Sequence, residues 1–353
     1  MTELFKLSPF ELNAWMDLLI AAGYPVFAPV FEEGTDKDNL YFKKIKKWND
    51  ADIGKLKTKR GPKELFFPIN EDLFSYKYNG DGFTLEDPEI EYEPFIVAGL
   101  RPCDTAGLDV IDKLFSWDYK DEFYLKKREK AILIAFTCPY TDSSCFCTSV
   151  LGKYPYKDGS DIMLTQLKSK DYIVEILTEK GKKLLSHLNK VINPASKEDL
   201  KELKKELDNI DKSIKKIKID KVKSWLENNF EDDYWKNCAL ECLSCGICTF
   251  VCPTCHCFDI IEDRNLDKIT RRRTWDSCSF TDFTRMKVHQ PRQEHFRRWR
   301  QRLMHKYYYY VNNFEVIACT GCGRCIESCP VGINIMTMLS EIDDKGKKLK
   351  AKA

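Results

Sequence analysis

The sequence predicts a multi-domain α+β protein in three parts. An α/β domain is expected over residues 1–190, an amphipathic helical connector over 191–234, and a cysteine-rich α-helical domain over 235–353. Three observations predict this division. Apolar runs of strand length recur in the first part, leucine and isoleucine repeat at helical spacing in the second, and one cysteine pattern occurs twice in the third.

Five β-rich runs predict the strands of the first domain. They are residues 25–30, 65–69, 95–98, 131–136 and 172–177. The third and fourth runs are continuously apolar, which is typical of buried parallel strands. Asp104 is predicted to be the N-cap of a helix that follows the third strand.

The connector is predicted to be one amphipathic helix. It starts at a capping box formed by Ser196 and Asp199. Six apolar residues then follow at alternating steps of three and four: Leu200, Leu203, Leu207, Ile210, Ile214 and Ile217. Such a seam indicates either a helix that packs on its own protein or a docking helix for a partner subunit.

Two copies of one cysteine pattern define the third domain. They are Cys242-x2-Cys245-x2-Cys248-x3-Cys252-Pro253 and Cys319-x2-Cys322-x2-Cys325-x3-Cys329-Pro330. This is the spacing of bacterial two-cluster ferredoxins, in which thiolates hold [4Fe–4S] clusters and the fourth cysteine of each run ligates the other cluster. Cys242, Cys245, Cys248 and Cys329 are therefore predicted to hold one cluster, and Cys319, Cys322, Cys325 and Cys252 the other. Zinc suits C-x2-C pairs but rarely such stepped triplets.

Four further cysteines predict a third cluster site in the α/β domain. Cys103 and Cys138 each follow one of the apolar strands, and Cys145 and Cys147 lie in the next loop. The carboxyl ends of parallel neighbours meet at one edge of a sheet, where α/β folds bind ligands. The alternative is that these are buried free thiols.

The remaining cysteines allow a fourth site. Cys255, Cys257 and Cys278 supply three possible metal ligands, and His289 and His295 are the candidates for a fourth. The alternative is that these thiols are only buried close to the clusters. Cys238 has no partner in the sequence and is expected to be structural.

The two cysteine runs are separated by a basic insert, residues 258–318. Its section 264–306 contains thirteen Lys or Arg and four Asp or Glu, with aromatic residues interleaved. A nucleic-acid-binding iron–sulfur protein is therefore one hypothesis. The net charge of +2 argues against it, and basic patches on redox proteins also dock acidic partners.

Several common features are not found in the sequence. No dinucleotide fingerprint or P-loop is present, so no flavin or nucleotide site is expected in this chain. No apolar run is long enough for a membrane span. The start of the chain has no signal-peptide pattern, which together with sixteen cysteines favours a cytoplasmic, metal-binding protein without disulfides.

The sequence resembles the iron–sulfur β-subunit family of cytoplasmic NiFe hydrogenases and the electron-transfer subunit of anaerobic sulfite reductase. The shared residues include Arg101-Pro102-Cys103-Asp104, Cys145-Phe146-Cys147, Cys252-Pro253-Thr254-Cys255-x-Cys257 and Arg272-Arg273-x-Trp275-x-Ser277-Cys278. The resemblance strengthens the case for the third cluster, because its four candidate thiols belong to the shared pattern. The sequence differs from the hydrogenase type around residues 285–296.

The resemblance implies an electron-transfer subunit without catalytic residues of its own. It would stand between a flavin subunit that oxidises NAD(P)H and a catalytic hydrogenase subunit. The alternatives are the corresponding subunit of an anaerobic sulfite reductase and the electron-input subunit of a heterodisulfide reductase complex. A sulfite or disulfide reductase activity in this chain itself is disfavoured, because the chain has no adjacent Cys-Cys pair.

Overall fold

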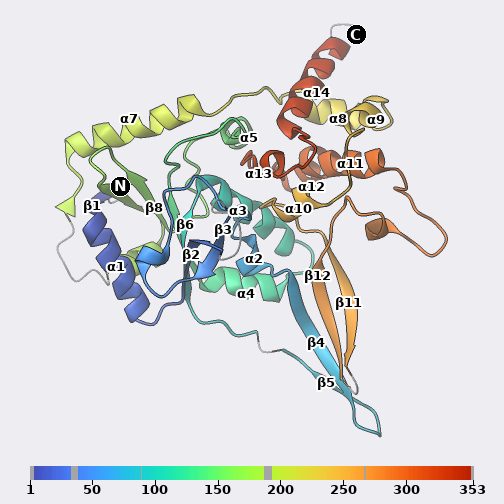
Figure 1. Ribbon diagram of the computed structural model, residues 1–353, viewed down its shortest axis with the longest axis horizontal. Helices are drawn as coiled ribbons and strands as arrows, with labels where there is room; N and C mark the ends of the chain where they lie inside the picture. The colour runs from blue at the N-terminus through green and yellow to red at the C-terminus, as the bar shows by residue number, and fades with distance from the viewer. Residues whose placement is uncertain (1–3, 33–38, 89, 187–192, 266–267, 351–353) are drawn as a thin grey trace.

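The computed structural model describes residues 4–32, 39–88, 90–186, 193–265 and 268–350, and in these it places an eight-stranded sheet (Figure 1). The strand order is β10-β1-β9-β8-β7-β6-β2-β3. The strands are β1 (Leu4–Leu7), β2 (Val26–Phe31), β3 (Leu40–Lys44), β6 (Phe95–Leu100), β7 (Ala131–Phe136), β8 (Ile162–Gln166), β9 (Tyr172–Ile176) and β10 (Asn193–Pro194). The central strands β2, β6, β7 and β8 pair in parallel, and the outer pairs are antiparallel.

Helices cover both faces of this sheet. Strand β7 is buried along its whole length, and its side chains alternate between two apolar clusters. Ile132 and Ile134 belong to the cluster with α1 (Pro9–Ala21) and α6 (Glu179–Leu185). Leu133 belongs to the opposite cluster, with α3 (Pro102–Phe115) and α4 (Glu122–Lys130). The first part of the chain is thus a mixed α/β unit with buried parallel strands, as predicted.

Two local predictions for this unit are wrong. Residues 65–69 are not a strand: they begin within the short helix α2 (Lys63–Phe66) and lead into strand β4 (Asn70–Tyr78). Phe66 and Phe67 are both fully buried, so consecutive side chains enter the core, and a short apolar run does not reveal this difference. Asp104 is not the N-cap of α3. Arg101 is, and the Asp104 carboxylate accepts a hydrogen bond from the Arg101 backbone N–H at 3.0 Å.

A second sheet joins the two halves of the chain. Among the described residues it has four strands in the order β11-β12-β4-β5. β4 (Asn70–Tyr78) and β5 (Phe83–Glu86) come from the N-terminal half, whereas β11 (Phe258–Asn265) and β12 (Lys268–Trp275) come from the basic insert. The two hairpins extend together away from the larger sheet (Figure 1). The basic insert therefore packs on the α/β domain as well as on the cysteine runs.

The C-terminal part is built from helices around its own apolar core. The helices are α8 (Val222–Asn228), α9 (Tyr234–Cys238), α10 (Ile247–Phe250), α11 (His295–Met304), α12 (Tyr310–Phe314), α13 (Arg324–Glu327) and α14 (Ile335–Lys350). A π-helical turn, His305–Tyr309, connects α11 with α12. Within the described residues, no helix has the length and apolarity that a membrane crossing requires.

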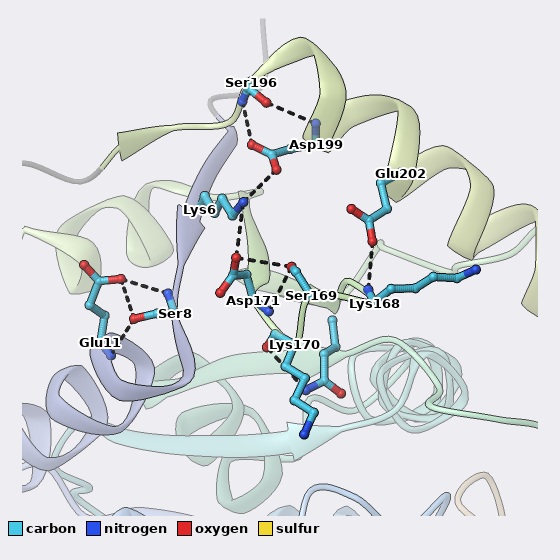
Figure 2. A network of polar contacts seen from close by, with 11 residues as sticks. Lys6, Ser8, Glu11, Lys168, Ser169, Lys170, Asp171, Ser196, Asp199 and Glu202 are labelled. Carbon is cyan, nitrogen blue, oxygen red and sulfur yellow. Dashed lines mark hydrogen bonds and ion pairs between the residues drawn. The ribbon is translucent and has the colours of Figure 1, made fainter.

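The connector helix α7 (Lys197–Ser213) lies across the α/β domain and is held there by polar contacts. Figure 2 shows Lys6 between Asp171 and Asp199, with Nζ to carboxylate distances of 3.2 and 2.8 Å. The expected capping box of Ser196 and Asp199 is formed. The predicted seam is too long, because the helix ends at Ser213. Ile214 is buried beyond that end, in the extended segment that leads to the C-terminal core.

We predict that a buried ion pair between the two halves is essential to stability. Arg273 on β12 binds Glu71 on β4 and Asp121, the N-cap of α4, and its side chain is almost fully buried. An Arg273→Met substitution leaves the largely buried Asp121 without a cation among the described residues and leaves Glu71 with Lys127 as its remaining cation. It should cost about 3 kcal/mol in the free energy of unfolding. Denaturant unfolding under anaerobic conditions measures this.

The control is Arg271→Met on the same strand. Arg271 pairs with Glu262 at 3.3 Å in an exposed position, so its loss should cost about 0–1 kcal/mol. Equal effects of the two substitutions would contradict the prediction.

Candidate metal centres

The first ferredoxin cavity is formed mainly by the first cysteine run. Its lining includes Cys242, Cys245, Cys248 and Cys329, which are the four thiols predicted to share one cluster. Backbone N–H groups of Ser244 and Ile333 donate to the sulfurs of Cys242 and Cys329 at 3.4 and 3.3 Å. Most of the other lining residues are apolar, and Cys245 is exposed to solvent. This cavity therefore lies at the surface of the C-terminal part.

The second ferredoxin cavity is formed by the other predicted set. Cys252, Cys319, Cys322 and Cys325 all contribute to its lining. Three of these four cysteines are buried, unlike Cys245 in the first cavity. The Gly321 N–H donates to the Cys319 sulfur at 3.4 Å, and the Lys306 ammonium lies 3.3 Å from the Cys252 sulfur. The structure thus brings Cys252 of the first run together with three cysteines of the second run.

The sheet-edge cavity lies where β6 and β7 end. Cys103 at the start of α3, Cys138 after β7, and Cys145 and Cys147 from the next loop all line it. β6 and β7 are parallel neighbours, so their carboxyl ends meet at this edge. Burial raises the pKa of the Cys145 thiol to about 12, with partial opposition from Lys57. Such a thiol loses its proton when a metal binds it.

Two glycines allow the sheet-edge loop to pack on the second cysteine run. Gly321 and Gly323 have φ values of +63° and +79°. A Cβ on Gly321 would lie 2.6 Å from the Cα of Cys147, and one on Gly323 would lie 2.0 Å from the Ser144 hydroxyl oxygen. The Phe146 N–H donates to the Gly321 carbonyl at 2.9 Å. The close approach places the sheet-edge cavity directly beside the second ferredoxin cavity.

A fourth cavity lies at the base of the β11–β12 hairpin, and we call it the hairpin cavity. Cys255, Cys257 and Cys278 line it, as do His256 and His305. The predicted candidates His289 and His295 are not among its lining residues. His256 and His305 were not predicted to line this cavity. The position of His256 between Cys255 and Cys257 could have indicated that it lies beside their thiols.

The structure also bears on Cys238 and on the zinc alternative. Cys238 lines none of the four cavities, and its thiol donates to the Trp235 carbonyl at 3.5 Å. In the described part of the chain, no three Cys, His, Asp or Glu side chains are grouped to hold a single metal ion. A zinc ion needs its ligands to converge on one point, whereas each thiolate around an iron–sulfur cluster binds a different iron.

Four buried cations next to these cavities have no carboxylate partner among the described residues. They are Lys63, Arg101, Arg302 and Lys306. Each binds backbone carbonyl groups, and the last two also contact the sulfurs of Cys255 and Cys252 at 3.3 Å. Burying a charge without a counter-charge is costly. A cluster held by thiolates supplies the missing negative charge, so these residues fit [4Fe–4S] groups. Nothing in the local sequence around the four cations indicates this role.

The basic insert directs many of its cations inward. Arg273 pairs with Glu71 and Asp121, and Arg298 donates to the carbonyl of Ser279. Arg300 stacks on Phe230 at 3.6 Å and binds Glu231. These cations are therefore engaged within the protein, and the insert supports the fold around the cavities.

Two comparisons with known proteins bear on the cysteine runs. Residues 241–333 match the family described as "4Fe-4S dicluster domain". Sulfhydrogenase 2 subunit beta of Pyrococcus furiosus is 29% identical over 325 residues, which cover 90% of this chain and 92% of that protein. The resemblance to hydrogenase iron–sulfur β-subunits is confirmed. Both comparisons support [4Fe–4S] clusters and the role of an iron–sulfur electron-transfer subunit.

We predict that Lys306 sets the reduction potential at the second ferredoxin cavity. A Lys306→Met substitution removes a positive charge beside Cys252 and so destabilises the reduced state, which has one more negative charge. The potential should fall by an amount on the order of 60 mV, which corresponds to about 1.4 kcal/mol for one electron. A potentiometric titration followed by electron paramagnetic resonance measures it.

Lys153→Met is the control, because Lys153 is exposed, pairs with Asp158 and lines neither ferredoxin cavity. An unchanged or higher potential in the Lys306 variant would show that this ammonium does not act on the cluster.

Proposed function

We propose that this chain is the electron-transfer subunit of a hydrogenase-type complex, with [4Fe–4S] clusters in the two ferredoxin cavities and in the sheet-edge cavity. Cys242, Cys245, Cys248 and Cys329 would hold the first cluster, and Cys252, Cys319, Cys322 and Cys325 the second. Cys103, Cys138, Cys145 and Cys147 would hold the third. Iron–sulfur clusters, when bound, accept and release one electron at a time.

The observation that supports this proposal most directly is that the three cavities adjoin one another in series. Cys322 lines both the sheet-edge cavity and the second ferredoxin cavity. Cys325 lines both the second and the first ferredoxin cavities. A purely structural metal site would not need three adjoining cavities, each lined by at least four cysteines, that extend from the sheet edge to the surface. The series gives electrons a route through the whole chain.

The surface end of the series has an apolar rim. Leu243 and Ile247 line the first ferredoxin cavity and are exposed, and Leu240 close to them in sequence is 74% exposed. Exposed apolar side chains around a redox site are typical of a docking surface for a protein partner. We infer that a partner subunit covers this rim and exchanges electrons there. The flavin that reacts with NAD(P)H would then belong to another subunit.

The iron content of the chain tests the cluster assignments. Purified anaerobically, the chain should bind at least about twelve irons, four for each cluster. A Cys138→Ala substitution removes a ligand of the sheet-edge cavity and should lower the count by about four. Elemental analysis with acid-labile sulfide determination gives the numbers.

Cys238→Ala is the matched control, because Cys238 lines none of the cavities and its loss should leave the iron content unchanged. Little iron together with stoichiometric zinc in the wild-type chain would refute the proposal.

Anaerobic affinity purification from the native cells tests the partner. The co-eluting proteins should include a flavoprotein and a catalytic NiFe subunit. A Leu243→Asp variant should recover several-fold less of at least one of them while keeping its iron. Leu18→Asp on the exposed side of α1 should recover the normal amount. Co-elution of a sulfite reductase or a heterodisulfide reductase subunit would instead identify one of the two alternative complexes.

A further inference from the structure

The hairpin cavity lies outside the series formed by the sheet-edge cavity and the two ferredoxin cavities. Its empty space, counted together with the adjoining open solvent, is about 270 Å³, compared with about 320 Å³ on the same measure for the second ferredoxin cavity. We propose that the hairpin cavity binds a fourth [4Fe–4S] cluster, with the thiolates of Cys255, Cys257 and Cys278 and the Nε2 atom of His256 as its ligands. The proposal rests on the proposed function and extends it by one redox centre.

The register of the hairpin brings two of the thiols together. Phe258 of β11 pairs with Trp275 of β12, and the Asp276 N–H then donates to the Cys257 carbonyl at 2.9 Å. Cys278 follows two residues later, so it stands next to Cys257 at the base of the hairpin. The two thiols are twenty-one positions apart in the sequence and meet only because the strands pair in this register.

Cys255 reaches the same cavity from the first cysteine run. It follows Cys252 by three residues, and Cys252 lines the second ferredoxin cavity. Arg302 and Lys306 are in the walls of both cavities. The hairpin cavity is therefore a direct neighbour of the second ferredoxin cavity and forms a side branch of the series.

His256 lines the hairpin cavity, and the backbone holds one of its two ring nitrogens. Its Nδ1 atom lies 3.1 Å from the Thr254 carbonyl oxygen, to which it donates when the proton is on Nδ1. The lone pair is then on Nε2, and a backbone carbonyl that fixes the tautomer in this way is a common companion of metal-binding histidines. The ring of His305 packs edge-on against His256 with centroids 5.1 Å apart. His305 thus supports the ring of His256.

The charges around the cavity favour an anionic occupant. Arg302 donates to the Cys255 sulfur at 3.3 Å, and Lys63 donates to the Cys255 carbonyl at 2.7 Å. Both cations are buried and have no carboxylate partner in the part of the chain that the structure describes. The three thiolates outweigh the positive charge of a [4Fe–4S] core, so the bound cluster would be a net anion that partly offsets these two cations.

Iron counting on the full-length chain, reconstituted anaerobically with iron and sulfide, is the first test. The wild-type chain should contain about sixteen irons, and Cys278→Ala should contain about twelve. The Cys238→Ala control should retain the wild-type content. A wild-type chain with about twelve irons, or with one zinc that Cys278→Ala loses, overturns this inference and leaves the proposed function intact. A chain nearly without iron refutes both.

The fourth ligand is tested by nitrogen hyperfine spectroscopy on the reduced wild-type chain. The other three clusters have only sulfur ligands, so a directly bound imidazole should give the one strong nitrogen coupling. His256→Cys should abolish this coupling and keep the iron, whereas His305→Gln should keep both. The absence of the coupling in the wild-type chain, or its loss in His305→Gln alone, would overturn the assignment of His256.

Discussion

The balance of charge inside the protein constrains the whole fold. Lys63, Arg101, Arg302 and Lys306 are buried beside thiol-lined cavities, and in the described residues none of them meets a carboxylate. Isolated buried cations are unstable unless an anion accompanies them. Thiolate-bound clusters provide that anion, and the cations in turn stabilise the clusters. Cofactor binding and folding should therefore be strongly coupled in this chain.

Other buried cations have protein partners and serve to join segments. Arg324 follows Cys322 in the second cysteine run and pairs with Asp104 beside Cys103 at 2.8 Å, with both side chains almost fully buried. Lys57 binds Asp142 and Glu327 at 2.8 and 2.6 Å and also donates to the Cys322 carbonyl. These pairs fix the sheet-edge loop against the second ferredoxin cavity. The α/β domain is thus part of the redox apparatus as well as a scaffold.

The two halves are interleaved, which explains how distant segments complete each site. The basic insert leaves the C-terminal part, adds two strands to the β4–β5 hairpin, and returns through α11 to the thiols. Near the end of the insert, Arg302 contacts the Cys255 sulfur and Lys306 contacts the Cys252 sulfur. The insert therefore connects the β4–β5 hairpin, the hairpin cavity and the second ferredoxin cavity through backbone pairing and hydrogen bonds.

Local spacing in the sequence was enough to predict several features of the sites. The stepped cysteines predicted which thiols line each ferredoxin cavity, including Cys329 in the first and Cys252 in the second. The apolar runs at 95–98 and 131–136 predicted parallel strands that place Cys103 and Cys138 at one edge. Long-range packing determined the rest. The hairpin register placed Cys278 beside Cys257, and the π-helical turn supplied His305 to the hairpin cavity in place of His289 or His295. Burial of Phe66 and Phe67 replaced an expected strand with a helix end. These outcomes depend on contacts between residues far apart in the chain, and local propensity does not encode such contacts.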